Sequence, residues 1–211
     1  TLDACDLHAA TCSIGGGFIF GHDAIRDWLA AWIEGITGRT ASTEAFVPAW
    51  DEPLLDAQGQ PVLDEHGMQK IARAKLDVTF HDSEGRRCYV DIVVTSAASS
   101  SAEKRAKRAG EDGAAAADAV RTKRARYPAA KAPNSPMIPF AVEALGRLSP
   151  EAQGLLNAIA PEDKALRSVV LRRAKQTLSV LIQTRLAELL LSAEPGREGA
   201  LPAPAAPAAA A

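Results

Sequence analysis

The amino-acid sequence predicts an α/β fold of the α+β type, with a small mixed sheet of about four strands in αβββαβ order and helices beside it. Three observations predict this class. Two runs rich in β-branched and aromatic residues flank a polar turn, apolar residues at helical spacing precede them, and a long amphipathic stripe follows near the end of the chain. The 211 residues are enough for one domain with appendages.

Composition restricts the class of protein further. The formal net charge of -2 does not by itself indicate a nucleic-acid partner, so local charge has to be considered instead. The three cysteines are an odd number and do not form a secreted disulfide framework. Because the sequence shows neither a signal peptide nor a long apolar span, we expect an intracellular protein without a membrane segment. The first residue is Thr1, and we expect the chain to be part of a longer polypeptide.

The N-terminal segment, residues 1–22, contains four possible ligands for a soft or borderline metal. Cys5, His8 and Cys12 precede a glycine-rich turn, and His22 follows it. Thiolates and neutral imidazoles at this spacing can form a tetrahedral zinc site. We therefore expect a zinc-knuckle-like segment here, whereas the alternative is that Cys12 is an ordinary buried thiol.

The first helix is predicted to begin at His22. Apolar residues recur at helical spacing as far as Ile33, and Gly35 and Gly38 are expected to end the helix. A short strand is then predicted near Glu44. The following stretch, 51–70, contains two prolines and two glycines between acidic residues, which indicates a loop or an irregular hairpin insert.

The central hairpin is predicted over Lys75 to Thr95, with its turn at 82–85. Each strand carries one carboxylate between apolar residues, namely Asp77 and Asp91. An unpaired buried carboxylate is costly, and two neighbouring carboxylates repel each other, so a divalent cation between them would remove both costs. The alternative is that both aspartates simply face solvent.

One alanine-rich helix is predicted over residues 101–127, with Gly110 and Gly113 as its weak points. Both ends are basic. Such a run is usually a solvent-exposed face, but its position directly after the two aspartates favours contacts with nucleic-acid phosphates. The residues expected to make these contacts are Lys104, Arg105, Lys107, Arg108, Arg121, Arg124 and Arg126.

The last elements follow from periodicity and capping. A strand is predicted from Met137, and Pro139 indicates that it lies at an edge of the sheet. Ser149 and Pro150 predict the start of a short helix. We expect a core over residues 23–160, an amphipathic C-terminal helix over 161–193, and a disordered tail rich in proline and alanine over 194–211.

The order of these elements and their motifs resembles the restriction-endonuclease-like, or PD-(D/E)XK, nuclease superfamily. Within it, the chain looks like the nuclease-like region that follows the reverse transcriptase in retroelement polyproteins. The residues that carry the resemblance are His8-Ala-Ala-Thr-Cys12 with the glycines that follow, His22 to Asp27, Leu76-Asp77-Val78, Tyr89 to Val93, Lys123 with Tyr127, and Ile138 to Phe140 ahead of Glu143 and Gly146.

The resemblance implies roles for individual residues. Asp77 and Asp91 would bind Mg²⁺ or Mn²⁺, and Glu44 would be an auxiliary acid. The lysine that the family places two residues after the second acid is replaced here by Val93, and Lys123 resembles a lysine that has moved to the following helix. A zinc ion at the Cys and His cluster would be structural or would help to dock DNA.

The function implied is metal-dependent nicking of target DNA by an endonuclease domain linked to an upstream reverse transcriptase, inside the nucleus. Two alternatives remain open. One is a catalytically inactive domain that binds nucleic acid, DNA or RNA, or serves a structural role. The other is an unrelated small α/β domain, which predicts Asp77 and Asp91 on opposite faces of the sheet.

Overall fold

A four-stranded mixed sheet forms the centre of the molecule and confirms the predicted class. The computed structural model describes residues 17–96 and 101–192. Within the sheet, the first three strands pair antiparallel and the last is parallel to its neighbour. In spatial order the strands are β1 (Ser42–Phe46), β4 (Lys75–His81), β5 (Arg87–Thr95) and β6 (Met137–Glu143).

The hairpin of β4 and β5 has the predicted turn. The carboxylate of Asp82 accepts the backbone N–H groups of Glu84 and Arg86, both at 2.9 Å. Gly85 then takes a φ of 77°, which glycine adopts without steric cost. An aspartate and a glycine three residues apart therefore determine this reversal, because one supplies the acceptor and the other the left-handed backbone.

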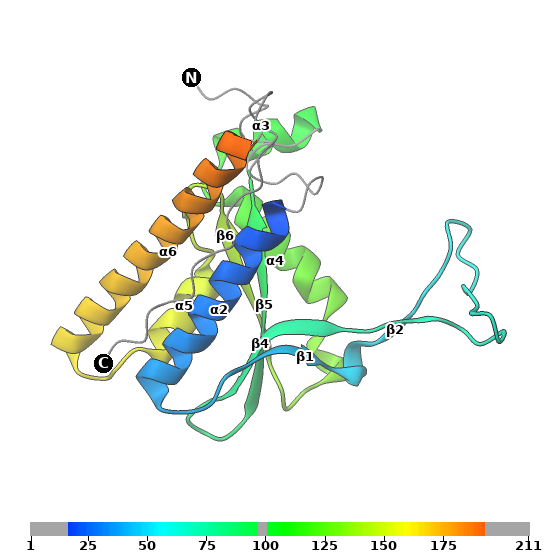
Figure 1. Ribbon diagram of the computed structural model, residues 1–211, viewed down its shortest axis with the longest axis horizontal. Coiled ribbons are helices and arrows are strands. Elements are labelled where there is room, and N and C mark those ends of the chain that lie inside the picture. Colours follow the sequence, from blue (N-terminus) through cyan, green and yellow to red (C-terminus); the bar gives the residue numbers. More distant parts are fainter. Residues whose placement is uncertain (1–16, 97–100, 193–211) are drawn as a thin grey trace.

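Three helices cover one face of the sheet (Figure 1): α2 (Gly17–Thr37), α5 (Pro150–Ile159) and α6 (Lys164–Ser192). Their contact with the strands is apolar. Ile25 and Leu29 of α2 lie in one buried cluster with Val90 of β5 and Phe140 of β6, and Leu156 of α5 and Leu178 of α6 complete it. This cluster is the main core and fixes α2 against the sheet.

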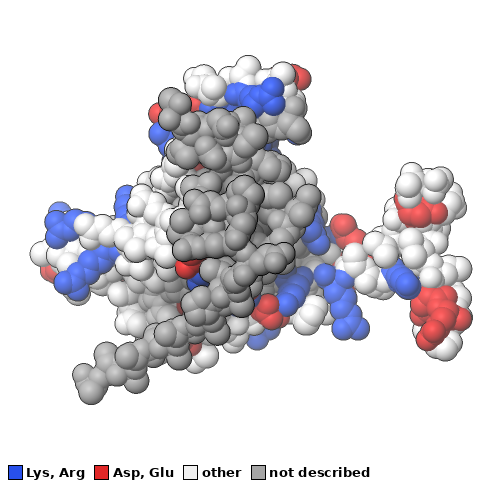
Figure 2. Space-filling view, turned by 45° about the horizontal axis from the view of Figure 1, so that its top comes forward, with Lys and Arg blue, Asp and Glu red and all other residues white. Residues whose placement is uncertain are grey.

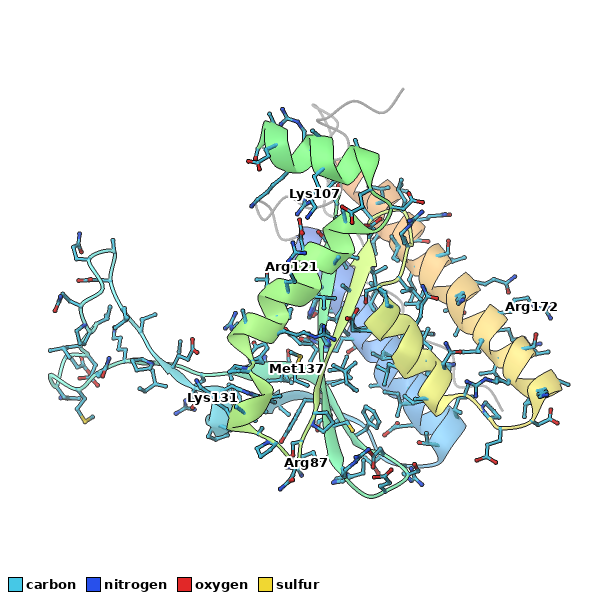
Figure 3. All side chains as sticks on the ribbon, turned by 180° about the vertical axis from the view of Figure 1, so that it is seen from behind. Arg87, Lys107, Arg121, Lys131, Met137 and Arg172 are labelled. Carbon is cyan, nitrogen blue, oxygen red and sulfur yellow. The ribbon has the colours of Figure 1, made fainter. Side chains whose placement is uncertain are left out.

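The opposite face is covered by α4 (Ala114–Arg126), which Figure 3 shows in front of the sheet. Ala116 and Val120 pack on Ala141 of β6, so small side chains on both elements allow a close approach. Two short 3₁₀ turns also occur: η1 (Pro48–Trp50) follows β1, and η2 (Ala129–Lys131) follows α4.

The single helix predicted over residues 101–127 was wrong. The structure divides it into α3 (Ala102–Gly110) and α4, and Gly113 takes a φ of 78° between them. A left-handed residue cannot continue a helix, so the two glycines that were identified as weak points instead form a corner. This corner turns α3 away from α4.

Two helix boundaries also differ from the prediction. The first helix begins at Gly17 rather than at His22 and runs through Gly35, which costs only about 1 kcal/mol relative to alanine. Burial of Ile33 on the same helix outweighs that cost. In α6, Leu178 and Ile182 are buried whereas Leu166 is 51% exposed, so the predicted stripe is core only along part of its length.

The insert between β1 and β4 is a projecting arm, residues 51–74, which extends away from the sheet in Figure 1. Its base pairs β2 (Glu52–Pro53) with β3 (Ile71–Ala72). Beyond the base, Asp56 and Asp64 each accept backbone N–H groups two and four residues later, as Asp82 does in the main hairpin. Acidic side chains gather at the far end of the arm in Figure 2.

Three further predictions concern the edge strand, membrane-spanning helices and the C-terminal tail. Strand β6, which contains Pro139, is at an edge of the sheet as expected, because proline cannot donate to a second neighbour. No helix in the described part of the chain is long and apolar enough to cross a membrane. The disorder predicted from residue 194 lies outside the described residues.

Because the arm contributes nothing to the main core, we expect it to be dispensable for folding. Replacing residues 54–70 with Asn-Gly, which suits a two-residue hairpin between Pro53 and Ile71, should change the free energy of unfolding by less than about 1 kcal/mol. Urea denaturation measures this change. By comparison, Trp50→Ala removes a buried indole at the base of the arm and should cost about 3–5 kcal/mol. Equal losses in the two variants would contradict this assignment.

Candidate active site

The candidate site lies where strands β4 and β5 separate. Their backbone pairing runs as far as Val78 opposite Val90, and the next residues along the two strands are Asp77 and Asp91. Beyond this point, the Ile92 N–H on the side of β5 that faces β4 donates to Asp77 Oδ2 at 2.6 Å. The carboxylate therefore takes the place of a strand carbonyl, which fixes its position.

The two carboxyl groups are in contact. The antiparallel register that pairs Val78 with Val90 puts Asp77 opposite Asp91 on the same face of the sheet, so the charge of each carboxylate acts on the other. Asp91 is buried, with 4% of its surface exposed. The alternative in which these residues point to opposite faces of the sheet and to solvent does not describe this structure.

Lys123 reaches Asp91 from α4. Its Nζ lies 2.6 Å from Asp91 Oδ2, which makes a close ion pair. The angles of this approach do not meet those of a hydrogen bond, and among the described residues Oδ2 is a buried acceptor without a hydrogen-bond partner. Such an oxygen is suited to an additional positively charged ligand.

His22 reaches Asp77 from the opposite layer. Its Nε2 lies 3.0 Å from Asp77 Oδ2, and its Nδ1 lies 3.3 Å from Asp23 Oδ1. Burial lowers the pKa of His22, but the hydrogen bonds and charges of Asp77 and Asp23 outweigh burial, so the pKa lies above its usual value. The imidazole is thus held in its charged form to a higher pH beside the carboxylate pair.

The two aspartates have pKa values displaced in opposite directions. Burial raises the pKa of Asp91 to about 6, against the opposing charge of Lys123 and with a further rise from Asp77. Burial also acts on Asp77, but the hydrogen bond and charge of His22 and the Ile92 N–H outweigh it, so its pKa lies below the usual value. One site therefore contains a carboxylate that stays ionised and one that takes up a proton near neutrality.

Tyr127 follows Lys123 by four residues, directly after α4. It is buried, packs edge-on against Trp50 with ring centroids 5.6 Å apart, and also contacts the cluster that includes Tyr89. Burial raises the pKa of Tyr127 to about 12, and the charge of Asp91 contributes to the rise. Its hydroxyl is therefore neutral at physiological pH.

Glu44 does not join the carboxylate pair. The register of β1 on β4 places it opposite Asp77, but its Oε1 contacts Lys75 Nζ at 2.9 Å and Arg26 Nη1 at 3.0 Å. It has a φ of 60°, which is uncommon for a residue other than glycine and indicates backbone strain. The predicted auxiliary acid is thus part of an ion-pair group at the rim of the site.

The donor set suits Mg²⁺ or Mn²⁺. These ions commonly bind one or two protein carboxylates and complete their coordination with water and substrate phosphate. Asp77 and Asp91 supply such a pair, and Lys123 Nζ occupies the position beside Asp91 Oδ2 in this structure. Within the described ranges, no group of three His, Cys, Asp or Glu side chains could hold a metal ion by itself.

The predicted zinc cluster cannot be assessed as a unit. Cys5, His8 and Cys12 lie outside the described residues. His22, the fourth expected ligand, has both ring nitrogens directed at carboxylates, which places it in the aspartate site instead. A signal for this role was present in the sequence, because His22 lies three residues before Ile25 and seven before Leu29 and therefore on the buried face of the helix.

The predicted phosphate-binding residues are not equivalent. Lys107, Arg108 and Arg121 contact Asp118. Arg124 pairs with Glu151 at 2.9 Å, and Arg126 lies over the ring of Tyr127. Lys104 and Arg105 of α3 are exposed. These residues therefore differ in the contact that each would have to break or share in order to bind a phosphate.

Comparisons with known proteins do not assign a family. No family model matches the chain, and no curated protein matches it.

The pKa of Asp91 predicts a pH dependence of stability. Its folded value of about 6 exceeds the unfolded value of roughly 4, so the folded state binds more protons between these pH values. The free energy of unfolding should fall by about 2–3 kcal/mol as the pH rises from 4 to 6. The lowered pKa of Asp77 acts below this window, and the raised pKa of His22 acts above it.

Asp91→Asn should remove this fall. Urea denaturation at several pH values in the presence of EDTA measures the difference between wild type and variant. Asp112→Asn is the matched control, because that side chain is 90% exposed on the surface. Parallel pH curves for wild type and Asp91→Asn would show that Asp91 is not the group responsible.

Proposed function

We propose that this chain is a metal-dependent endonuclease domain that hydrolyses phosphodiester bonds in DNA. The observation that carries the proposal is the convergence of Asp77, Asp91 and Lys123, from two strands and a helix, at one buried point. Two carboxylates on the inner strands β4 and β5, with a lysine from the helix that covers them, suit phosphoryl chemistry.

Each residue has a defined role in this proposal. Asp77 and Asp91 would hold Mg²⁺ or Mn²⁺, which when bound polarises a phosphate oxygen and makes coordinated water more acidic. Lys123 neutralises Asp91 in the structure and lies close enough to stabilise negative charge that develops on a phosphate at the same position. Tyr127 and Trp50 belong to a buried cluster with Leu76 and Tyr89 of the two strands that carry the aspartates.

His22 acts as a positioning residue. Its contact with Asp77, together with the Ile92 N–H, holds Asp77 in its ionised form and in one orientation. Groups that orient metal ligands in this way commonly change metal affinity or activity by 10- to 100-fold, by order of magnitude. His22 thus makes the geometry of Asp77 depend on the position of α2.

The wider context is also proposed. Exposed basic residues of α3 and α4 would contact the phosphate backbone without reading sequence. Together with the resemblance described above, this supports a domain that nicks target DNA for a linked reverse transcriptase in the nucleus.

A second candidate is a domain of the same fold that binds nucleic acid without cutting it. One observation favours it: Val93 occupies the position where a lysine would be expected, and Lys123 is engaged with Asp91. The two functions differ in metal-dependent cleavage.

Nicking of supercoiled plasmid tests the proposal. Wild type should convert supercoiled DNA to the open circle with Mg²⁺ or Mn²⁺ and not with EDTA. Asp77→Asn and Asp91→Asn should reduce the rate to background, because each removes half of the carboxylate pair. Lys123→Met should reduce it about 100-fold or more, since a positive charge at the phosphate is lost.

The control for this experiment is again Asp112→Asn, which should cleave at the wild-type rate. If wild type binds the plasmid and leaves it intact with either metal, the endonuclease proposal is wrong and the binding function replaces it. If Lys123→Met retains full activity, Lys123 is not the catalytic lysine.

His22→Gln tests the positioning role. We expect a rate that is about 10- to 100-fold lower, an increased Mg²⁺ concentration for half-maximal activity, and unchanged affinity for plasmid in EDTA. His81→Gln is the matched control, because His81 is exposed at the far end of β4. An unchanged Mg²⁺ requirement in His22→Gln would mean that the residue serves folding alone.

A further inference from the structure

Three basic side chains meet at one carboxylate where α3 and α4 join. Lys107 Nζ lies 3.7 Å from Asp118 Oδ1, Arg108 Nε lies 3.5 Å from Asp118 Oδ2, and Arg121 pairs with Oδ1 from the next turn of α4. We call these four residues the Asp118 cluster. Figure 3 shows Lys107 of α3 and Arg121 of α4 in the same part of the molecule, on the side that α4 covers.

The cluster has an excess of positive charge. Three cations against one carboxylate leave two positive charges, and the side chain of Asp118 is only 20% exposed. Burial by itself would raise the pKa of Asp118, but the charges of Lys107, Arg121 and Arg108 outweigh it and lower the pKa. Asp118 is therefore ionised at neutral pH.

The cluster also has more hydrogen-bond donors than Asp118 can accept. A lysine and two arginines carry far more N–H groups than the roughly four lone-pair sites of one carboxylate. Arg108 is only 15% exposed, and its Nη1 donates to the Ser96 carbonyl at 2.9 Å. Lys107 and Arg121 are 48% and 65% exposed, so their remaining N–H groups can donate to a second acceptor while they keep Asp118.

Two other basic residues of α4 each pair with one acid, so they form no group with excess positive charge. Arg124 is matched by the single acid Glu151, and Lys123 by Asp91. Asp118 is on the same helix as the proposed catalytic lysine: it precedes Lys123 by five residues, which is about 7.5 Å along the helix axis and about 140° around it.

We propose that the Asp118 cluster is a binding site for a backbone phosphate of nucleic acid, in which Asp118 holds the three cations together and at the same time competes with the phosphate. The inference rests on the proposed function for its choice of ligand. Asp118 has two opposing effects: it orders Lys107, Arg108 and Arg121 before binding, and it cancels one of their charges. A neutral side chain of the same shape keeps an acceptor for the three cations but no longer cancels a charge. Removing the charge of Asp118 in this way therefore strengthens binding.

The experiment measures the affinity of the full chain for a fluorescein-labelled 20-base-pair duplex by anisotropy in EDTA, at several KCl concentrations. Asp118→Asn keeps the shape of the side chain and removes its charge. We expect affinity about eightfold higher at 0.1 M salt and a salt slope that is steeper by about one ion, because one more positive charge acts on the phosphates. Arg121→Gln should make the slope shallower by about one ion.

The matched control is Glu111→Gln, which makes the same change in net charge at an exposed position directly after α3 and outside the cluster. It should leave the slope unchanged. Circular dichroism and thermal unfolding of each variant establish that the α3–α4 corner is intact, and Arg121→Gln tests the cluster in the opposite direction if Asp118→Asn is unstable.

The outcomes separate this inference from the proposed function. Equal slopes for Asp118→Asn and Glu111→Gln overturn the phosphate site, whatever the cleavage result. The expected slopes without cleavage support the phosphate site and count against the endonuclease. If wild type and variants bind neither this duplex nor a single strand of the same length, the phosphate site and the nucleic-acid function are both wrong.

Discussion

The structure depends on the burial of two carboxyl groups side by side where β4 and β5 separate. Burying an ionised carboxylate costs several kcal/mol unless it is paired, and a second carboxylate in contact adds repulsion. Here the Ile92 N–H and His22 at Asp77, and Lys123 at Asp91, offset that cost together. Each contribution comes from a different position in the chain, so the site forms only when the whole sheet and both helical layers are in place.

Packing of the two helical layers therefore determines the geometry of the site. On one side, Ile25 and Leu29 hold α2 on the sheet, and His22 extends the same helical face into the site. On the other, Ala116 and Val120 let α4 approach β6 closely enough for Lys123 to reach Asp91. A larger side chain at Ala116 would lift α4, so Ala116 controls the position of Lys123.

Charge is distributed unevenly, although the net charge is only -2. The arm ends in acidic residues, whereas α3 and the end of α4 carry most of the basic residues that adjoin the site. The arm also exposes apolar residues: Leu63 is 54% exposed and Met68 is 63% exposed. The arm thus differs in chemistry from the nucleic-acid surface that we propose.

The sequence by itself determined the features that depend on near neighbours: the Asp82 and Gly85 turn, the alternation of β4, the amphipathic face of α2 and the edge position of Pro139. It also indicated that Asp77 and Asp91 lie on neighbouring strands, whereas the grouping of Lys123 with them came from the family resemblance. Tertiary structure decided what pairs with what. His22 binds Asp77 rather than standing apart from it, Glu44 is engaged by Arg26 and Lys75, and residues 101–127 bend into two helices at Gly113. Such contacts join residues far apart in the chain, and their energies depend on burial and distance, which local patterns of residues do not specify.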